Sequence, residues 1–198
     1  GGAADRRYFA VFRQATYSEV AAVGTGDYVT FGFGGATAQR RDTNNGIPAE
    51  RPAYYTFTGD YAAVRITTLS GGTGDVEYIT GDATFYVDIP DFDVNGAVEG
   101  IIDNRVLYDV NGTPIAVLND YVSLATGEID FTTGIIGPSE AYGLEAGGEI
   151  SSGSWQGVFA GPNGEEIAGI VVLEGDVTDA EPDDTVRETG VFIVVNTE

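Results

Sequence analysis

The chain has 198 residues with nine Arg, 31 Asp plus Glu, and no Lys, His, Cys or Met, which gives a formal net charge of −22. Without Cys and His it cannot form a disulfide, an iron–sulfur cluster, an ordinary zinc site or a Ser-His-Asp triad. The acidic charge also excludes nucleic acids as partners, because phosphate neutralisation requires clustered Lys and Arg.

The first third of the chain differs in charge from the rest. Residues 1–65 contain seven Arg and six acidic residues, whereas residues 66–198 contain two Arg and 25 acidic residues. We expect the seven Arg to pair with the acidic remainder of the same molecule, through ion pairs that are individually weak. The alternative is docking on the acidic part of another copy, since such head-to-tail contacts produce rings or filaments. The seven are Arg6, Arg7, Arg13, Arg40, Arg41, Arg51 and Arg65.

Short alternating runs of Tyr, Phe, Val and Ala predict strands at the start of the chain. Three strands are expected there, at residues 7–13, 17–23 and 27–33. A polar stretch follows from Thr37 to Pro52, which contains Asn-Gly and two prolines and is the strongest linker signal in the chain. We therefore divide the chain into a small β-rich segment, residues 1–50, and a second domain, residues 51–198.

The second domain also reads as strands, with no segment of ten residues that follows the helical period. Asn-Gly, which supplies the positive φ angles of two-residue hairpin turns, occurs at Asn45, Asn95, Asn111 and Asn163. Many short strands joined by such turns indicate an antiparallel sandwich or barrel. Glycines inside strands indicate the bends of a closed barrel. The expected strands are 54–59, 61–69, 82–89, 97–102, 105–110, 114–118, 128–132, 154–159, 166–173 and 189–195, with a loop at 70–80.

One hairpin near the end of the chain carries a recognisable motif. Residues 153–169 follow the pattern G-x-F-x-G-P-x-A-x-E-[IV]-x-G, with Gly164 in place of the usual Ala. This run resembles the signature hairpin of the transferrin-binding-protein-like β-barrel family, and residues 80–101 resemble an earlier hairpin of that family. The matching residues of the late hairpin are Gly157, Phe159, Gly161, Pro162, Glu166, Ile167 and Gly169.

The resemblance implies an all-β fold, an antiparallel eight-stranded barrel preceded by a small β-rich handle in the place of residues 1–50. It also implies an exported or outer-membrane surface protein of a Gram-negative bacterium that binds a ligand or a partner protein. The motif residues are expected to hold the barrel closed and not to touch a ligand. Gly1 to Ala4 read as the small residues beside a signal cleavage or anchor site, and no apolar stretch is long enough for a membrane helix.

A calcium site is a second interpretation of one turn. Residues 91–96 match the first six positions of an EF-hand loop, although the twelfth position is Ile102 where a Glu is needed. An ordinary hairpin turn at Asn95-Gly96 is the expected structure. The alternative is a calcium site formed by Asp88, Asp91, Asp93 and Asn95.

No other cofactor and no enzyme activity are expected. Haem would need an axial ligand, and with His, Met and Cys absent only a Tyr in an open loop, such as Tyr78 or Tyr142, remains. The neighbours Glu165 and Glu166 should point to opposite faces of a strand, and no set of nucleophile, base and oxyanion donors can be assembled. The function expected is surface binding; the alternatives are a structural subunit that self-associates, or a calcium-dependent adhesive or carbohydrate-binding module.

Overall fold

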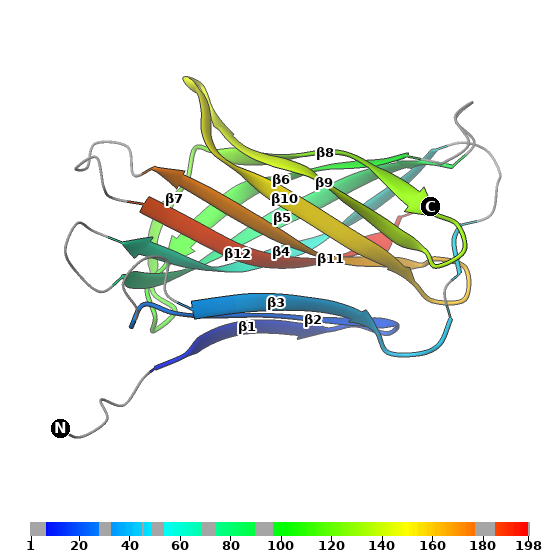
Figure 1. Cartoon of the computed structure of the whole chain (residues 1–198), viewed down its shortest axis with the longest axis horizontal. Coiled ribbons are helices and arrows are strands. Elements are labelled where there is room, and N and C mark those ends of the chain that lie inside the picture. The colour runs from blue at the N-terminus through cyan, green and yellow to red at the C-terminus, as the bar shows by residue number, and fades with distance from the viewer. Residues whose placement is uncertain are drawn as a thin grey trace.

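The computed structural model describes residues 7–27, 33–44, 46–48, 54–68, 74–89, 97–176 and 185–197. These ranges contain twelve strands and no helix. The strands form two bodies, a closed barrel and a three-stranded sheet that lies along one side of it (Figure 1). The all-β class predicted from the sequence is confirmed.

Eight strands close the barrel, each antiparallel to its neighbours. The first meets the last, since β12 pairs with β4 from Thr185 opposite Thr68 to Asn196 opposite Phe57. A further short strand, β7 (Pro114–Val117), pairs with the end of β6. The eight are β4 (Tyr54–Thr68), β5 (Asp75–Asp88), β6 (Ala97–Tyr108), β8 (Tyr121–Asp130), β9 (Ile135–Glu145), β10 (Gly148–Ala160), β11 (Glu166–Asp176) and β12 (Thr185–Asn196). The predicted eight-stranded antiparallel barrel is confirmed.

Apolar side chains fill the middle of the barrel, as expected when eight strands leave an interior just wide enough for side chains. Phe85 lies against both Trp155 and Phe192, with ring centroids 5.5 and 4.5 Å away. The indole Nε1 of Trp155 donates a 2.8 Å hydrogen bond to the Ala125 carbonyl, so this buried polar group is satisfied. The middle of the barrel is therefore a packed core and not a channel.

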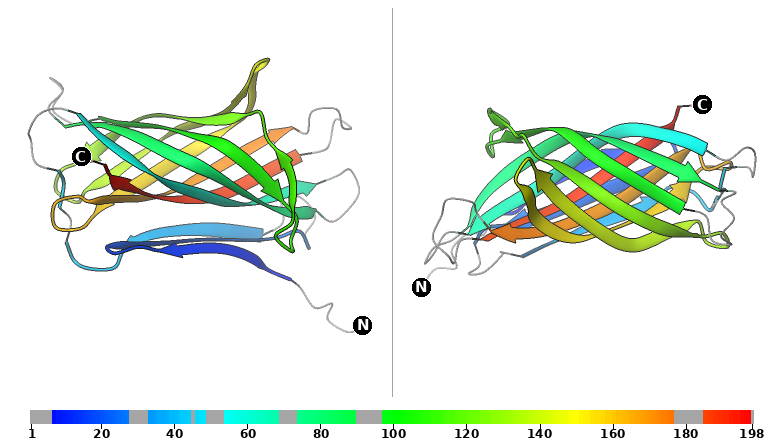
Figure 2. Two further views of the ribbon diagram at one scale, coloured as in Figure 1. Left: turned by 180° about the vertical axis from the view of Figure 1, so that it is seen from behind. Right: turned by 90° about the horizontal axis from the view of Figure 1, so that it is seen from above.

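The N-terminal sheet consists of β1 (Phe9–Gln14), β2 (Ser18–Thr25) and β3 (Phe33–Arg40), in that order and antiparallel. Alternate residues of β2 face the barrel. Val20 and Ala22 are buried there in one cluster with Ala168 of β11 and with Val191 and Ile193 of β12. Figure 2 shows this sheet following the barrel wall from two further directions.

Polar contacts complete the junction between the N-terminal sheet and the barrel. The buried Glu166 carboxylate accepts hydrogen bonds from the backbone N–H groups of Thr16 and Tyr17 and, at 2.7 Å, from the Ser18 hydroxyl. Arg40 donates to the carbonyls of Phe159 and Thr133, both at 2.5 Å. Arg13 pairs with Asp60 of the barrel. Arg13 thus pairs with a carboxylate of its own molecule, as the first of the two interpretations expected, whereas Arg40 binds backbone carbonyls. Arg6 and Arg51 lie outside the described residues.

Several strands differ from the predicted ones. Strand β3 runs from Phe33 to Arg40 and extends into the polar stretch taken for a linker, because it pairs with the whole of β2. Most of the predicted strand 27–33 lies outside the described residues, since they do not include 28–32. Strand β9 was missed, since Gly137-Pro138 and Gly143 interrupt its pattern. It is held by pairing with β8 on one side and with β10 on the other. Strand β5 also begins at Asp75, inside the predicted loop 70–80.

Two Asn-Gly hairpins lie where the sequence placed them, but with a different turn geometry. Among the described residues, positive φ occurs at Gly112 (80°) and Gly164 (68°) and at neither preceding Asn. In the first turn the Asp109 carboxylate instead accepts the Asn111 and Thr113 N–H groups, as in an Asx turn. The other two Asn-Gly pairs involve Asn45 and Asn95, which lie outside the described residues.

Candidate functional site

A polar cavity of about 240 Å³ opens at the end of the barrel where β4 and β11 finish and β8 and β12 begin. We call it the end cavity. Its wall carries both positive and negative side chains. The charged lining residues are Arg65, Arg105, Asp120, Glu145 and Glu188, and the uncharged ones are Leu118, Ile150, Ser151, Gly175 and Val186.

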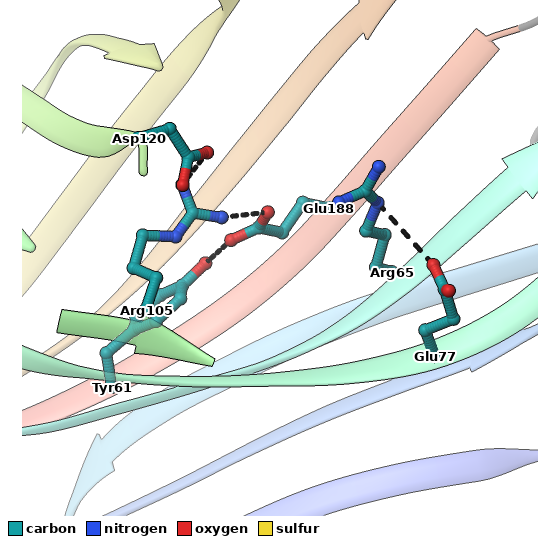
Figure 3. Close-up of polar contacts among 6 residues, drawn as sticks. All are labelled: Tyr61, Arg65, Glu77, Arg105, Asp120 and Glu188. Atoms are coloured by element: carbon teal, nitrogen blue, oxygen red, sulfur yellow. Dashed lines mark hydrogen bonds and ion pairs between the residues drawn. The ribbon is translucent and has the colours of Figure 1, made fainter. Parts of the chain in front are cut away.

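Arg105 lies at the centre of the charged group, with only 2% of its surface exposed. Its Nη1 donates to Asp120 Oδ2 at 2.9 Å and its Nη2 donates to Glu188 Oε2 at 2.5 Å. The Tyr61 hydroxyl donates to the other oxygen of Glu188, Oε1, at 2.6 Å (Figure 3). One guanidinium therefore joins two carboxylates, as its fork of donors allows.

An irregularity in β6 turns Arg105 into the barrel. Val98 and Ile102 point inward at even positions, but Arg105 and Leu107 are buried at odd positions. Between the two sets, Asn104 has a φ of 50°, and the pairing with β5 shifts register opposite this point. Such a bulge adds one residue to a strand and changes which side chains face the core. Simple alternation along β6 would have placed Arg105 outside.

Two atoms of this group are buried without a hydrogen-bond partner among the described residues: Arg105 Nε, a donor, and Asp120 Oδ1, an acceptor. The Arg65 guanidinium shows the same feature, since its Nε lies 3.7 Å from Glu77 Oε2, which is an ion-pair distance but too long for a hydrogen bond. A buried polar group left unpaired costs about 1–3 kcal/mol. The buried charged network on the wall of the end cavity is therefore incompletely hydrogen-bonded among the described residues.

Burial decides the protonation of this cluster. It raises the pKa of the Tyr61 phenol well above its ordinary value, and the adjacent Glu188 carboxylate raises it further, so Tyr61 remains a donor. For Arg105, burial alone would lower the pKa, but Glu188, Tyr61 and Asp120 outweigh it and the pKa is raised. Burial raises the pKa of Asp120 against the opposing effect of Arg105. The network therefore holds fixed donors and acceptors and contains no activated nucleophile.

A larger crevice of about 520 Å³ lies between β3 and the barrel strands β10 and β11. Small side chains such as Ala36 and Ala38 line much of it, and Arg40 at its edge donates to barrel carbonyls. None of the buried unpartnered side-chain atoms of the described residues belongs to its lining. We therefore place the candidate site at the end cavity, whose wall contains the buried charged network with its unpartnered atoms.

The calcium interpretation is untested by the structure. Asp91, Asp93 and Asn95 lie outside the described residues, and Asp88 ends β5 as a partly buried residue opposite Ala97. Within the described ranges no group of three acidic side chains is arranged to hold a metal ion.

For haem, the expected open-loop positions were wrong, because Tyr78 lies in β5 against Phe9 and Tyr142 lies in β9 with its hydroxyl donating to Glu140.

The motif residues lie in and around the β10–β11 hairpin, and none of them lines the end cavity. Gly157 pairs with Gly169, where a Cβ would lie 2.2 Å from the Phe192 ring. Phe159 is buried in the core and Glu166 holds the N-terminal sheet. The neighbouring Glu165 carboxylate does not contact the N-terminal sheet in the same way, and instead accepts hydrogen bonds from the backbone N–H and the side-chain amide of Asn163 in the turn. Of the three remaining motif residues, Ile167 is buried in the core, and Gly161, with a φ of 94°, and the exposed Pro162 lie between the strands.

The barrel with its preceding sheet has the architecture that the resemblance to transferrin-binding-protein-like domains implied. No protein-family model matches the chain, and no curated protein matches it. Among solved structures, the chain is similar to a mutant of the vaccine antigen transferrin binding protein B from Actinobacillus pleuropneumoniae H49. The identity is 14% and the TM-score is 0.47, over 95% of this chain and 81% of that chain. In the described ranges no helix has the length and apolar character needed to cross a membrane.

Proposed function

We propose that this chain is a non-enzymatic binding protein of the cell surface or outer-membrane surface, and that it takes a ligand in the end cavity. The observation that carries the proposal is the buried charged network of Arg105, Asp120 and Glu188 on the wall of that cavity, where Arg105 Nε and Asp120 Oδ1 have no hydrogen-bond partner among the described residues. Ligand sites typically combine a concave shape with a few fixed polar groups that set orientation. Here those groups are held by Glu188 and Tyr61 before any ligand arrives.

The same geometry supports binding over catalysis. Both carboxylate oxygens of Glu188 are engaged, and Tyr61 is held protonated as their donor. A nucleophilic mechanism would require a nucleophile within hydrogen-bond reach of a base that can take its proton. Tyr61 is bonded to Glu188 but keeps its proton, and the wall of the end cavity presents two Arg and three acidic side chains on a rigid frame, which suits recognition.

The alternative of a structural subunit has less support. Head-to-tail assembly would need the Arg-rich region to be available to another copy, but Arg13, Arg40 and Arg41 already bind Asp60 and backbone carbonyls of their own chain. Size-exclusion chromatography across a salt series separates the two. A monomer at every salt concentration agrees with the binding protein, and a polymer that dissociates in salt would favour the subunit.

A melting screen tests the proposal. The purified chain is heated with low-millimolar members of four probe classes: neutral polyols, amino acids, organic anions and organic cations. A ligand that binds only the folded state raises the midpoint. We expect one class to raise it in the unmodified protein and not in Val186→Phe, in which the added ring occupies the end cavity. If no class distinguishes the two proteins, the proposal is wrong.

A further inference from the structure

We infer that the outer face of the N-terminal sheet, the face turned away from the barrel, binds a second copy of this chain in a weak two-fold dimer. The inference is independent of the end cavity and goes beyond the proposed function. It follows from three properties of the outer face: its apolar composition, a hollow beside an exposed aromatic ring, and the absence of net charge. Such a dimer differs from head-to-tail assembly, because a two-fold contact stops at two copies.

The outer face is poor in charged side chains for so acidic a protein. Val20 and Ala22 of β2 face the barrel, so the residues that alternate with them face away from it. No other described element lies over this side of the sheet (Figure 1). Two of its three cross-strand rows contain no charge and consist of Ala10, Val23 and Gly35 and of Phe12, Ala21 and Thr37. A solvated sheet face is normally polar, so this composition indicates a contact surface.

The third row of the outer face supplies its one charge among the paired rows, Glu19. This residue lies between Gln14 of β1 and Gln39 of β3. The Gln14 side-chain amide donates a 3.1 Å hydrogen bond to Glu19 Oε2, and the Gln39 side-chain amide donates to Glu19 Oε1. Both carboxylate oxygens are thus bonded within the sheet, so the carboxylate keeps these bonds when the face is covered.

An exposed ring and a hollow lie next to each other on the outer face. The Phe12 side chain is 83% exposed. Beside it, a hollow of about 290 Å³ is lined by residues of all three strands, among them Ala21 and Thr37. A cavity of about 150 Å³ already takes a benzene ring, so this hollow has room for a Phe side chain. A two-fold axis near Ala21 would place each Phe12 ring in the hollow of the other copy, which is the self-complementarity that an isologous contact requires.

The charge distribution favours this face over any other for contact between two copies. Residues 1–50 contain five Arg and five acidic residues, whereas residues 51–198 contain four Arg and 26 acidic residues and so carry the whole formal charge of −22. Contact between two barrels would bring like charges together. Contact between two outer faces keeps the barrels about 30 Å apart, at about 10 Å for each packed layer, which is several Debye lengths of about 8 Å at physiological salt. A strongly charged partner of either sign would find no complementary charge here.

The outer face is small, so the dimer should be weak. The three rows on three strands cover about 15 by 20 Å before the protruding Phe12 ring is counted, which is less than the about 800 Å² per partner of a standard interface. We therefore expect the dimer to be half formed at about 10–100 µM chain, and the chain to be largely monomeric below that range. Salt should strengthen the dimer, because at about 0.01 M salt the Debye length is about 30 Å and the two barrels still repel each other.

Sedimentation equilibrium of the full chain tests the inference, from about 5 to 300 µM at about 0.01 and 0.15 M salt. We expect a monomer–dimer equilibrium with no larger species and a lower dissociation constant at the higher salt. Phe12→Ser should raise the dissociation constant at least about tenfold by removing two buried rings from the dimer. Ala21→Gln, which fills the hollow without adding charge, should do the same. The control, Tyr86→Ser, removes another exposed aromatic side chain, on β5 of the barrel, and should stay within about twofold of the unmodified protein. Melting curves confirm that each variant is folded.

A spin label locates the contact. The chain has no Cys, so Thr16→Cys, at an exposed position of the β1–β2 turn, gives one attachment point at the rim of the outer face. Spin-labelled chain is mixed with unlabelled chain enriched in ¹⁵N, so that any broadening comes from the other copy. The amide signals of Phe12 and Ala21 should broaden, and that of Trp155 in the barrel core should not.

Each other result overturns a stated part of the inference. A monomer throughout the concentration range at both salt concentrations would overturn the dimer. A dimer that Phe12→Ser and Ala21→Gln leave unchanged, or broadening confined to barrel amides, would overturn the assignment to the outer face. Species larger than a dimer would overturn the two-fold contact, and dissociation by salt would show that ion pairs hold the copies together.

Discussion

Glu166 and Asp120 are both carboxylates withdrawn from water, and their surroundings differ in one respect. Glu166, 4% exposed, accepts from two backbone N–H groups and a Ser hydroxyl at the junction of the N-terminal sheet with the barrel. Asp120 has one oxygen bound to Arg105 and the other without a partner, beside a cavity. The satisfied carboxylate joins two parts of the fold. The unsatisfied one lies on the wall of the end cavity, where we propose that a ligand binds.

The largest effect is expected from removing the cation of the end cavity. Arg105→Leu leaves Asp120 and Glu188 buried without their positive partner, which typically costs about 3–5 kcal/mol in the free energy of unfolding. Urea unfolding measures the loss. Replacing the whole ionic group together, Arg105→Leu with Asp120→Leu and Glu188→Leu, should recover most of it. If Arg105→Leu alone lowers the free energy of unfolding by less than about 1 kcal/mol, Arg105 does not form the buried network with Asp120 and Glu188 that the structure shows.

A smaller effect is expected at the satisfied carboxylate. Glu166→Ala leaves the Thr16 and Tyr17 N–H groups and the Ser18 hydroxyl without their acceptor, at a cost of about 1–3 kcal/mol. Because these donors lie in the β1–β2 turn, their amide hydrogens should exchange faster while those of the barrel core, such as Trp155, keep their protection. Glu128→Ala, at an exposed strand position, is the control. Unchanged exchange at Thr16 and Tyr17 would contradict the role of Glu166 as a joint.

The pH dependence of stability should distinguish Asp120 from an ordinary surface acid. Burial raises its pKa in the folded state above the usual 3.8, so the folded protein binds the proton more tightly than the unfolded chain does. Stability is therefore fully present below the ordinary value and decreases as pH rises through the raised pKa. Unfolding of the unmodified protein and Asp120→Asn, followed from pH 3 to pH 7, about the range of that titration, should show the unmodified protein losing stability relative to the variant. A difference that changes in the opposite direction would contradict this prediction.

The smallest effect is expected at the exposed ion pair between Arg13 and Asp60, whose side chains are 43% and 67% exposed. Exposed pairs contribute about 0–1 kcal/mol and are screened by salt. A double-mutant cycle with Arg13→Gln and Asp60→Asn, at low and high salt, should give a coupling energy in that range that falls with salt. A coupling above about 2 kcal/mol, insensitive to salt, would place this pair with the buried groups.

The local patterns in the sequence predicted much of the barrel and none of the end cavity. Alternation located most strands, and the motif around Gly157 and Phe159 placed the β10–β11 hairpin. Strand β6 was predicted as two pieces separated at residues 103–104, which is where the bulge at Asn104 lies. The inward-facing positions change from even to odd numbers at this bulge. The alternation in residues 97–102 therefore could not show that Arg105 faces the interior. A lone Arg within an apolar strand was the only local signal of the site.

The sequence by itself determined the fold class and the excluded chemistry, because period-two alternation is a property of neighbouring residues and because absent residue types cannot be supplied by folding. The tertiary structure alone decided two things. Strand β9 exists because β8 and β10 pair with it on both sides, despite its weak pattern. The end cavity exists because barrel closure brings together Tyr61, Arg105, Asp120 and Glu188 from four separate segments. Their burial and their missing partners are properties of that closure, and no local pattern contains them.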